Sequence, residues 1–194
     1  MIATKIEEAY HLIDEANAED PNHETVDGIS VPKELIYGKR MTATLEQFEP
    51  DASDALRLAA RAQHICRWQI PRESYSMDRT GYLKWRTDLK KFHADKASSL
   101  LIQVGFSADT IERVAFLLQK KQLKRDDGTQ TLEDVICLVF LEHYYEDFFQ
   151  KHSDEKIVDI LQKTWKKMSD KGHQAALKIS YSEKGLKLIK KAIS

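Results

Sequence analysis

The sequence predicts an all-α protein that forms one compact domain of about seven or eight helices over residues 1–194. Glycine and proline are scarce, with seven and four residues in a chain of 194, which leaves long segments free of helix-breaking residues. Apolar residues recur at spacings of three and four, and no segment keeps the alternation typical of a half-buried strand. The composition, 42% hydrophobic and 31% charged, is typical of a globular protein, and the length suffices for a sizeable core.

Residues that begin or end helices divide the chain into its predicted elements. Pro32 can open a helix that runs through Phe48, because proline is favoured in the first helical turn. Asp51 or Ser53 then caps a long helix, and the residues before the proline, 17–32, form a turn-rich loop. In order, the predicted helices cover residues 2–16, 32–48, 52–68, 82–104, 107–121, the segment after Thr131, and 154–171.

The later boundaries rest on the same chemistry. Gly105 is expected to end the fourth helix, since glycine readily adopts the left-handed conformation found there. Ser107 and Thr131 are the predicted N-cap residues of the next two helices, and Gly172 ends the penultimate one. A Lys-rich tail from about residue 178 closes the chain.

The segment Val135–Leu141, VICLVFL, is apolar on every side and should be among the most buried parts of the protein. It is also the longest apolar run, and it is far shorter than the roughly 20 residues that a membrane-spanning helix needs. Cys66 and Cys137 lie in apolar helical patterns, which favours two buried free thiols over a disulfide. The N-terminus is acidic and amphipathic, unlike a signal peptide. Together these features predict a cytoplasmic protein without a membrane-spanning segment.

The most unusual segment is residues 61–96, where basic, aromatic and histidine side chains are interleaved. It holds nine Lys or Arg against four acids, although the net charge of the chain is only −1. Buried Arg and His must be hydrogen-bonded, so a segment rich in both predicts a lined cavity. Arginine binds phosphate oxygens and aromatic rings stack on a base or sugar, which favours a phosphorylated ligand. The residues predicted to contact that ligand are Arg61, Arg67, Arg86, Trp68 and Tyr82.

An alternative interpretation stays open for these arginines. The first third of the chain is acidic, and the arginines could pair with it as a structural network.

Two histidines and a carboxylate could add a metal to this site. His64 and His93 lie on apolar and basic faces of two predicted helices, and Asp134 stands at the start of the buried helix. Side chains that project inward from three helices can close around a divalent metal such as Mn, Fe, Co, Ni, Zn or Mg. Two plainer interpretations remain. A histidine on an apolar face is often a core residue, and Asp134 can be a helix cap.

A histidine on one helix, FHADKA on the next and the acidic pair that opens TLEDVICLVFLEHY follow one another in this chain. This order resembles the HD-domain superfamily of metal-dependent phosphohydrolases, which are all-α proteins. Ala94 takes the position of that family's dyad aspartate, and Asp95 is the nearest acid. The resemblance predicts catalytic roles for Asp95 and for Glu133. The metal ligands that it implies are His64, His93 and Asp134, with Glu133 as the near alternative to Asp134.

Longer strings extend from about Ile6 to Leu177, namely NAEDPN, RAQHICRW, the GYLKWR–FHA block, LEDVICLVFLEHY and KTWKKMS. They are similar to a family catalogued as domain of unknown function 4202. That resemblance implies no activity, so function has to come from the residues.

Two classes of function follow from these residues. The first is a metal-dependent phosphohydrolase, or a related phosphate-processing enzyme, that acts on a nucleotide or small phosphoester. The second is a non-catalytic helical module that binds a nucleotide or an RNA end in the same cavity. Residues 154–191 also carry ten lysines, a pattern that is usually a solvated surface but can follow an RNA backbone.

Overall fold

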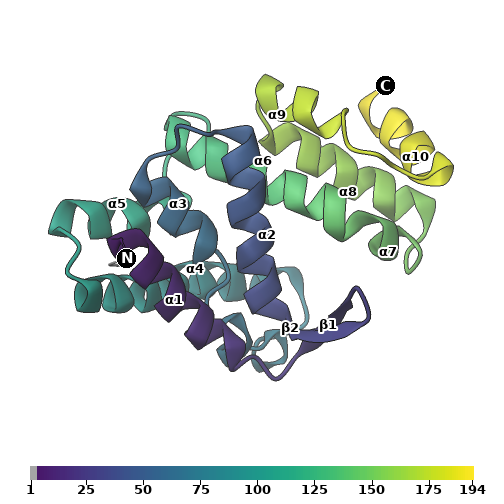
Figure 1. Ribbon diagram of the computed structural model, residues 1–194. Helices are drawn as coiled ribbons and strands as arrows, with labels where there is room; N and C mark the ends of the chain where they lie inside the picture. The colour runs from purple at the N-terminus through teal and green to yellow at the C-terminus, as the bar shows by residue number, and fades with distance from the viewer. Residues whose placement is uncertain (1–3) are drawn as a thin grey trace. The chain divides into compact units, whose positions relative to one another are not determined.

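The computed structural model describes residues 4–194, so the predicted helix start at Ile2 lies outside the described residues. Within that range the chain forms ten α-helices and one two-stranded antiparallel sheet (Figure 1). The helical prediction is confirmed, although the expected number of helices was too low. The contacts within the chain divide it into two compact units, the first ending at Lys121 and the second beginning at Gln122.

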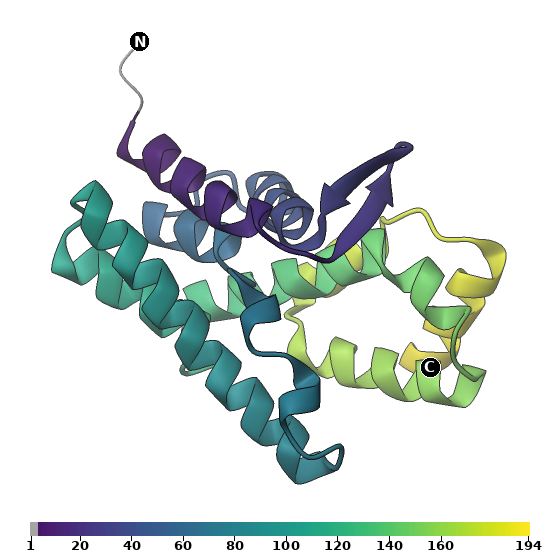
Figure 2. The same cartoon turned by 90° about the horizontal axis from the view of Figure 1, so that it is seen from below.

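The first unit contains five α-helices, a hairpin and two short 3₁₀ helices. The longest helix, α4, packs along α5 and α1, and α3 lies against α2 and α5 (Figures 1 and 2). Their facing apolar side chains form a core in which Ile13, Met41 and Leu58 are at most 1% exposed. The elements are α1 (Lys5–Ala18), β1 (His23–Val26), β2 (Ile29–Pro32), α2 (Lys33–Phe48), α3 (Asp54–Arg61), η1 (Arg67–Gln69), η2 (Arg72–Ser74), α4 (Arg79–Val104) and α5 (Ala108–Leu118).

Three predicted helix boundaries of this unit are confirmed. Pro32 directly precedes α2, and Gly105 ends α4 in the left-handed conformation with φ of 82°. The hydroxyl of Ser107 caps α5 by accepting a hydrogen bond from the backbone N–H of Thr110 at 3.3 Å.

The hairpin corrects the prediction of a loop over residues 17–32. Strands β1 and β2 pair so that Val26 lies opposite Ile29, and Asp27 and Gly28 form the two-residue turn. Both turn residues have positive φ, 51° and 78°, as tight hairpin turns require. With four residues each, the strands are too short to show an alternating pattern that sequence analysis could detect.

The predicted long helix over residues 52–68 is wrong in its second half. Helix α3 ends at Arg61, and residues 62–66 form a turn in which Cys66 is left-handed with φ of 51°. The cause is a tertiary contact, because the backbone N–H of Cys66 donates to the side-chain Oδ1 of buried Asn17 at 2.9 Å. His64 therefore stands in a turn and not on a helix face.

After this turn, η1 and η2 run beside the N-terminal half of α4 (Figure 2). The indole Nε1 of Trp85 on α4 donates to the carbonyl of Ile70 at 2.9 Å, and the hydroxyl of Tyr75 donates to Asp88 at 3.0 Å. These two bonds fix the segment that carries Arg67 against α4.

The second unit consists of five helices. Helix α6 packs against α7, α8 and α9, and α10 packs against α7 and α8. As predicted, the apolar segment of α6 is deeply buried, with Val135, Val139 and Leu141 at most 1% exposed. The elements are α6 (Asp127–His143), α7 (Tyr145–Phe149), α8 (Asp154–Lys167), α9 (Asp170–Ala176) and α10 (Glu183–Ile193).

Two predicted boundaries of this unit are wrong. Helix α6 begins four residues before Thr131, because the carboxylate of Asp126 caps it by accepting from the N–H of Thr129 at 2.8 Å. The predicted helix over 154–171 is broken after Lys167, and Gly172 lies inside α9 and does not end a helix.

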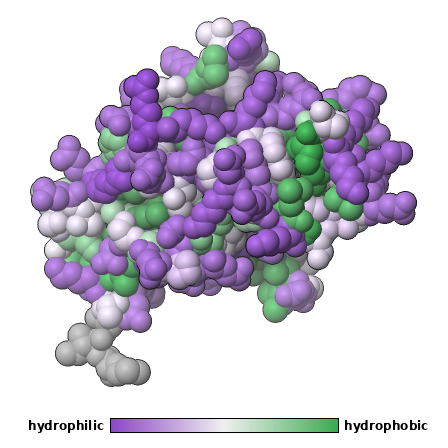
Figure 3. All heavy atoms as spheres, turned by 90° about the horizontal axis from the view of Figure 1, so that it is seen from above, coloured by the Kyte–Doolittle hydropathy of each residue, from purple (hydrophilic) through white to green (hydrophobic). Residues whose placement is uncertain are grey.

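The surface and the thiols agree with the composition. The face drawn in Figure 3 is mostly hydrophilic, with hydrophobic residues in small groups. Cys66 and Cys137 are buried free thiols, as predicted. Of the helices that the structure describes, none has both the length and the apolar character needed to cross a bilayer.

We expect Asn17→Ala to destabilise the protein by about 1–3 kcal/mol, because the buried N–H of Cys66 loses its acceptor. Urea denaturation of the full chain measures this. Asn22→Ala is the matched control, since Asn22 is exposed and its side chain bonds only to Asp20 nearby. Equal losses in the two variants would contradict a special role for Asn17.

Candidate functional site

Two histidines from distant parts of the first unit come together, as the sequence predicted. His64 lies in the turn after α3 and His93 lies in the middle of α4, and their ring centroids are 5.9 Å apart. The His64 side chain is 22% exposed, whereas His93 is only 4% exposed. Solvent therefore reaches this pair from the side of His64.

The hydrogen bonds of His64 define its protonation. Its Nε2 lies 3.1 Å from Nη1 of Arg67, and its Nδ1 lies 3.2 Å from Oε2 of Glu34. A guanidinium can only donate, so Nε2 must accept and Nδ1 must carry the ring proton that points at Glu34. His64 is therefore a neutral imidazole in one defined tautomer. In agreement, burial and then the nearby positive charges, Arg67 first, hold its pKa well below the ordinary value.

Helix α2 supplies the other side of the His64 pocket. The Tyr37 ring stacks on His64 with centroids 4.1 Å apart and an interplanar angle of 11°. Glu34, one turn earlier, is buried, and burial raises the pKa of its carboxyl to about 7. The backbone N–H of Glu34 donates to the carboxylate of Asp20 at 3.0 Å, which fixes the start of α2.

Sequence analysis missed Glu34. Its signal was an acidic residue on an otherwise apolar helical stripe, because Glu34, Tyr37, Met41 and Leu45 all face the core of the first unit. A lone charge at the start of such a stripe marks a candidate buried partner for a distant polar group.

His93 is the least satisfied group of the site. Its Nε2 is buried and has no hydrogen-bond partner among the described residues. Burial and then the proximity of His64, Arg67, Arg86 and Lys120 hold its pKa well below the ordinary value. A buried ring nitrogen without a partner is rare in folded proteins and calls for an explanation.

Positive charge surrounds the two rings. Arg67 is half-buried, and its guanidinium lies 4.9 Å from the centroid of the Trp85 ring. Among the described residues, Arg86 makes no hydrogen bond and no ion pair, although its charge acts on both histidines. We name this group the histidine–arginine cluster. Its members are Glu34, Tyr37, His64, Arg67, Arg86, His93 and Lys120.

The other predicted ligand-binding residues have different surroundings. One edge of the Arg61 guanidinium faces the carboxylate of Asp14 on α1, at 2.7 Å from Nε to Oδ1 and 2.5 Å from Nη2 to Oδ2. For Arg61, the open alternative of pairing with the acidic first third is therefore the one observed. Trp68 is half-buried, and Tyr82 is 45% exposed beside Trp85.

The predicted acids do not join the cluster within the first unit. Asp95 lies on α4 but is exposed to solvent, because a residue two positions after His93 points to another side of the helix. Glu133 belongs to α6 in the second unit, where it is 3% exposed and lies 3.7 Å from Nζ of Lys167.

Asp134 also belongs to α6, where its carboxylate holds the next helix in place. It accepts from the N–H of Ser169 at 2.8 Å and from the Ser169 hydroxyl at 2.6 Å, and Gln130 donates to it at 3.2 Å. Ser169 in turn caps α9 by accepting from the N–H of Gly172 at 3.1 Å. Asp134 therefore fixes the start of α9.

The donor set gives limited support for the expected metal. Over residues 4–194, no three His, Cys, Asp or Glu side chains gather as metal ligands would. The lone pair of His64 Nε2 faces a guanidinium, which repels a cation at that position. The metal therefore stays a prediction.

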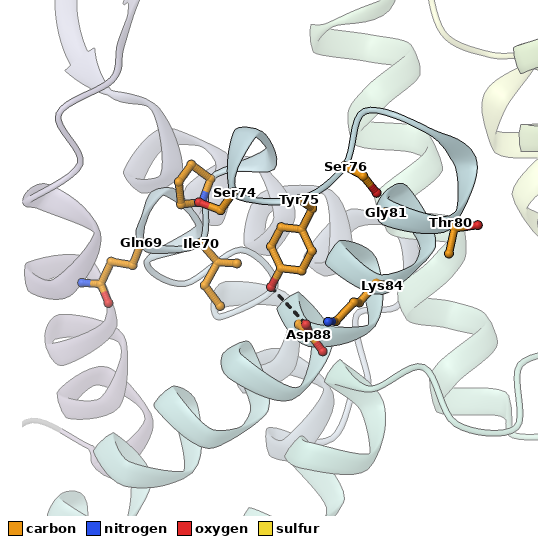
Figure 4. A pocket seen from close by; sticks show the side chains of 10 residues that line it. Gln69, Ile70, Ser74, Tyr75, Ser76, Thr80, Gly81, Lys84 and Asp88 are labelled. Atoms are coloured by element: carbon orange, nitrogen blue, oxygen red, sulfur yellow. Dashed lines mark hydrogen bonds between the residues drawn. The ribbon is translucent and has the colours of Figure 1, made fainter.

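Two cavities lie elsewhere. One of about 600 Å³ is lined by the segment before α4 and by α4 itself, with Tyr75, Lys84 and Asp88 among its residues (Figure 4). Residues 84 and 86 differ by about 200° around a helix, so this cavity lies on the face of α4 away from Arg86 and His93. The other, of about 690 Å³, lies in the second unit and is lined by lysines of α10.

Comparison with known proteins identifies the family. The sequence profile of the family described as domain of unknown function (DUF4202) matches residues 7–189, so the chain belongs to that family. No curated protein and no solved structure matches the chain.

We expect Gly172→Ala to destabilise the protein by about 1–3 kcal/mol, since the added Cβ would lie 2.6 Å from Oδ1 of Asp134. In an Asp134→Ala background the same change should cost much less, because the obstructing carboxylate is gone. Urea denaturation of the four proteins in the cycle measures this coupling. An equal cost in both backgrounds would show that Asp134 does not pack on α9 as described.

We expect ¹⁵N NMR of the imidazoles to show His64 as the Nδ1–H tautomer, still neutral well below its ordinary pKa. Arg67→Ala should raise the pKa of His64, because a nearby positive charge is removed. A pKa of His64 at the ordinary value of a histidine would contradict the described hydrogen bonds.

Proposed function

We propose that this chain is a phosphate-processing enzyme whose histidine–arginine cluster binds the phosphate of a nucleotide or another small phosphoester. The observation that carries the proposal is the imbalance of charge around a buried, unpartnered ring nitrogen. Arg67 and Arg86 both act on His93. The carboxylate of Glu34, which acts on Arg67, is itself destabilised as an anion by burial.

An anionic ligand would offset this imbalance. Its oxygens could accept hydrogen bonds from Arg67 and Arg86, and from His93 Nε2 when that nitrogen carries the ring proton. Phosphate suits such a site better than a single-charge anion, because its several oxygens match more than one donor at once.

The catalytic part of the proposal is supported by the neutral, oriented imidazole of His64. A non-catalytic module that binds a nucleotide or an RNA end through the same cluster is the competing outcome. Release of inorganic phosphate from nucleoside mono-, di- and triphosphates separates the two, and adding EDTA tests the predicted metal in the same assay. The two buried free thiols support a reducing compartment such as the cytoplasm for this activity.

We expect inorganic phosphate to raise the melting temperature of the wild-type protein by mass action. Arg67→Ala or Arg86→Ala should weaken phosphate binding about 10- to 100-fold, because a hydrogen bond to a charged group is worth about 1.5–3 kcal/mol. Arg→Lys should restore only part of the effect, since an ammonium lacks the planar two-point contact. Thermal melting over a phosphate titration measures each affinity.

Arg79→Ala is the matched control, because Arg79 is an exposed arginine at the start of the same helix as Arg86. The proposal fails if Arg67→Ala and Arg86→Ala lower stability without ligand while phosphate stabilises all variants alike. That pattern would assign the arginines to a structural network.

A further inference from the structure

We propose that His64 is the nucleophile of this site, and that its Nε2 accepts a phosphoryl group from a phosphoanhydride, with Glu34 as the residue that positions the ring. This inference rests on the proposed function, namely that the cluster binds phosphate.

The His64 ring is held in the way that a nucleophilic histidine requires. Its Nδ1–H faces Glu34 at 3.2 Å, and the Tyr37 ring covers one of its faces at 4.1 Å. Rotation of the ring would break both contacts, so the lone pair of Nε2 keeps one direction. A carboxylate on Nδ1–H also stabilises the positive charge that develops on the ring when Nε2 forms a new bond.

Arg67 places phosphate where this lone pair points. Its Nη1 is 3.1 Å from Nε2 of His64, and a guanidinium offers five donors in one plane. A phosphate oxygen that binds this guanidinium lies beside Nε2 and competes with it for the same N–H. Ligand binding thus transfers the Arg67 bond from the imidazole to the phosphate and frees the nucleophile.

The charges of the cluster select the leaving group. Arg67 and Arg86 supply positive charge but give up no proton, so they favour a group that departs as an anion. The terminal phosphoryl group of a nucleoside di- or triphosphate, or of pyrophosphate, has such a leaving group. An alkyl phosphate lacks such a leaving group, because an alkoxide needs a proton as it leaves.

The reaction then proceeds in two balanced steps. In the first, a bond forms between Nε2 of His64 and phosphorus, the bridging P–O bond breaks, and its electron pair stays on the departing phosphate. In the second, a water oxygen bonds to phosphorus, the N–P bond breaks, and the electron pair returns to Nε2. The proton of that water passes to the solvent, which reaches the two histidines from the side of His64.

The experiment is to incubate the full chain with pyrophosphate, quench in alkali and measure intact mass and ³¹P NMR. Phosphohistidine survives alkali and hydrolyses in acid, so the quench keeps it. We expect one phosphoryl group per chain, located on His64 by peptide mass spectrometry. The adduct should be absent in His64→Asn and unchanged in His11→Asn, the exposed control.

Glu34→Gln is the second variant, because it keeps His64 and does not depend on the folding of His64→Asn. It should slow phosphoryl transfer by about 10²-fold, the size typical of a lost orienting or proton-transfer group, and change KM far less than kcat. If the variant instead raises KM by the same factor as it lowers kcat, Glu34 is a binding or structural residue, and its positioning role is overturned.

Two negative results of these experiments have different consequences. If phosphate raises the melting temperature in an Arg67-dependent way but pyrophosphate at saturating concentration leaves no adduct, His64 is not a nucleophile, while the proposed function stands. If phosphate does not stabilise the protein at all, the proposed function falls and this inference falls with it.

Discussion

The candidate site depends on one buried hydrogen bond, from the backbone N–H of Cys66 to the side chain of Asn17. That bond ties α1 to the turn after α3 and holds Cys66 in the left-handed region, with φ of 51°. Without the turn, the pattern of residues 52–68 would continue as a helix and carry His64 away from α2. With the turn in place, the His64 ring stacks on Tyr37 and its Nδ1 faces Glu34. A polar side chain on one helix thus decides where another helix ends and where a functional group points.

Two arginines six residues apart show how position decides the role of a charge. Arg61, the last residue of α3, pairs with Asp14 and also donates to the hydroxyl of Thr42 at 3.2 Å, which joins three helices of the first unit. Arg67, beyond the turn, contacts His64 and the Trp85 ring, and no carboxylate lies within ion-pair distance of it among the described residues. Arg61 is a structural charge with its counterion, whereas Arg67 has no carboxylate partner among the described residues.

Much of the fold could be predicted because local chemistry determined it. Gly105 ends α4 and Ser107 begins α5 through contacts within four residues, which a sequence displays directly. The errors have a different origin. Helix α3 ends because of Asn17, 49 residues before Cys66, and α9 begins where Asp134 on α6 holds Ser169. Contacts over such separations leave no periodic pattern in the chain.

The candidate site could likewise be predicted only where local sequence determines it. The convergence of His64 and His93 could be predicted, since both lie among apolar and basic residues in one segment. Glu34 left only a weak signal on an apolar helical stripe, because an isolated acidic residue at the start of a helix usually serves the helix dipole. Its pairing with a histidine appears only when α2 is packed against the turn after α3.

The cost of leaving His93 unsatisfied is the strongest reason to expect a ligand. A buried polar atom without a partner costs about 1–3 kcal/mol, and a protein of this size has a total stability of only about 5–15 kcal/mol. The positive charges of Arg67 and Arg86 around the same ring add repulsion between themselves, and burial lowers the pKa of Arg67 as well. A bound oxyanion would offset both the unsatisfied nitrogen and the repulsion between the arginines. It would neutralise their charge and hydrogen-bond the His93 ring.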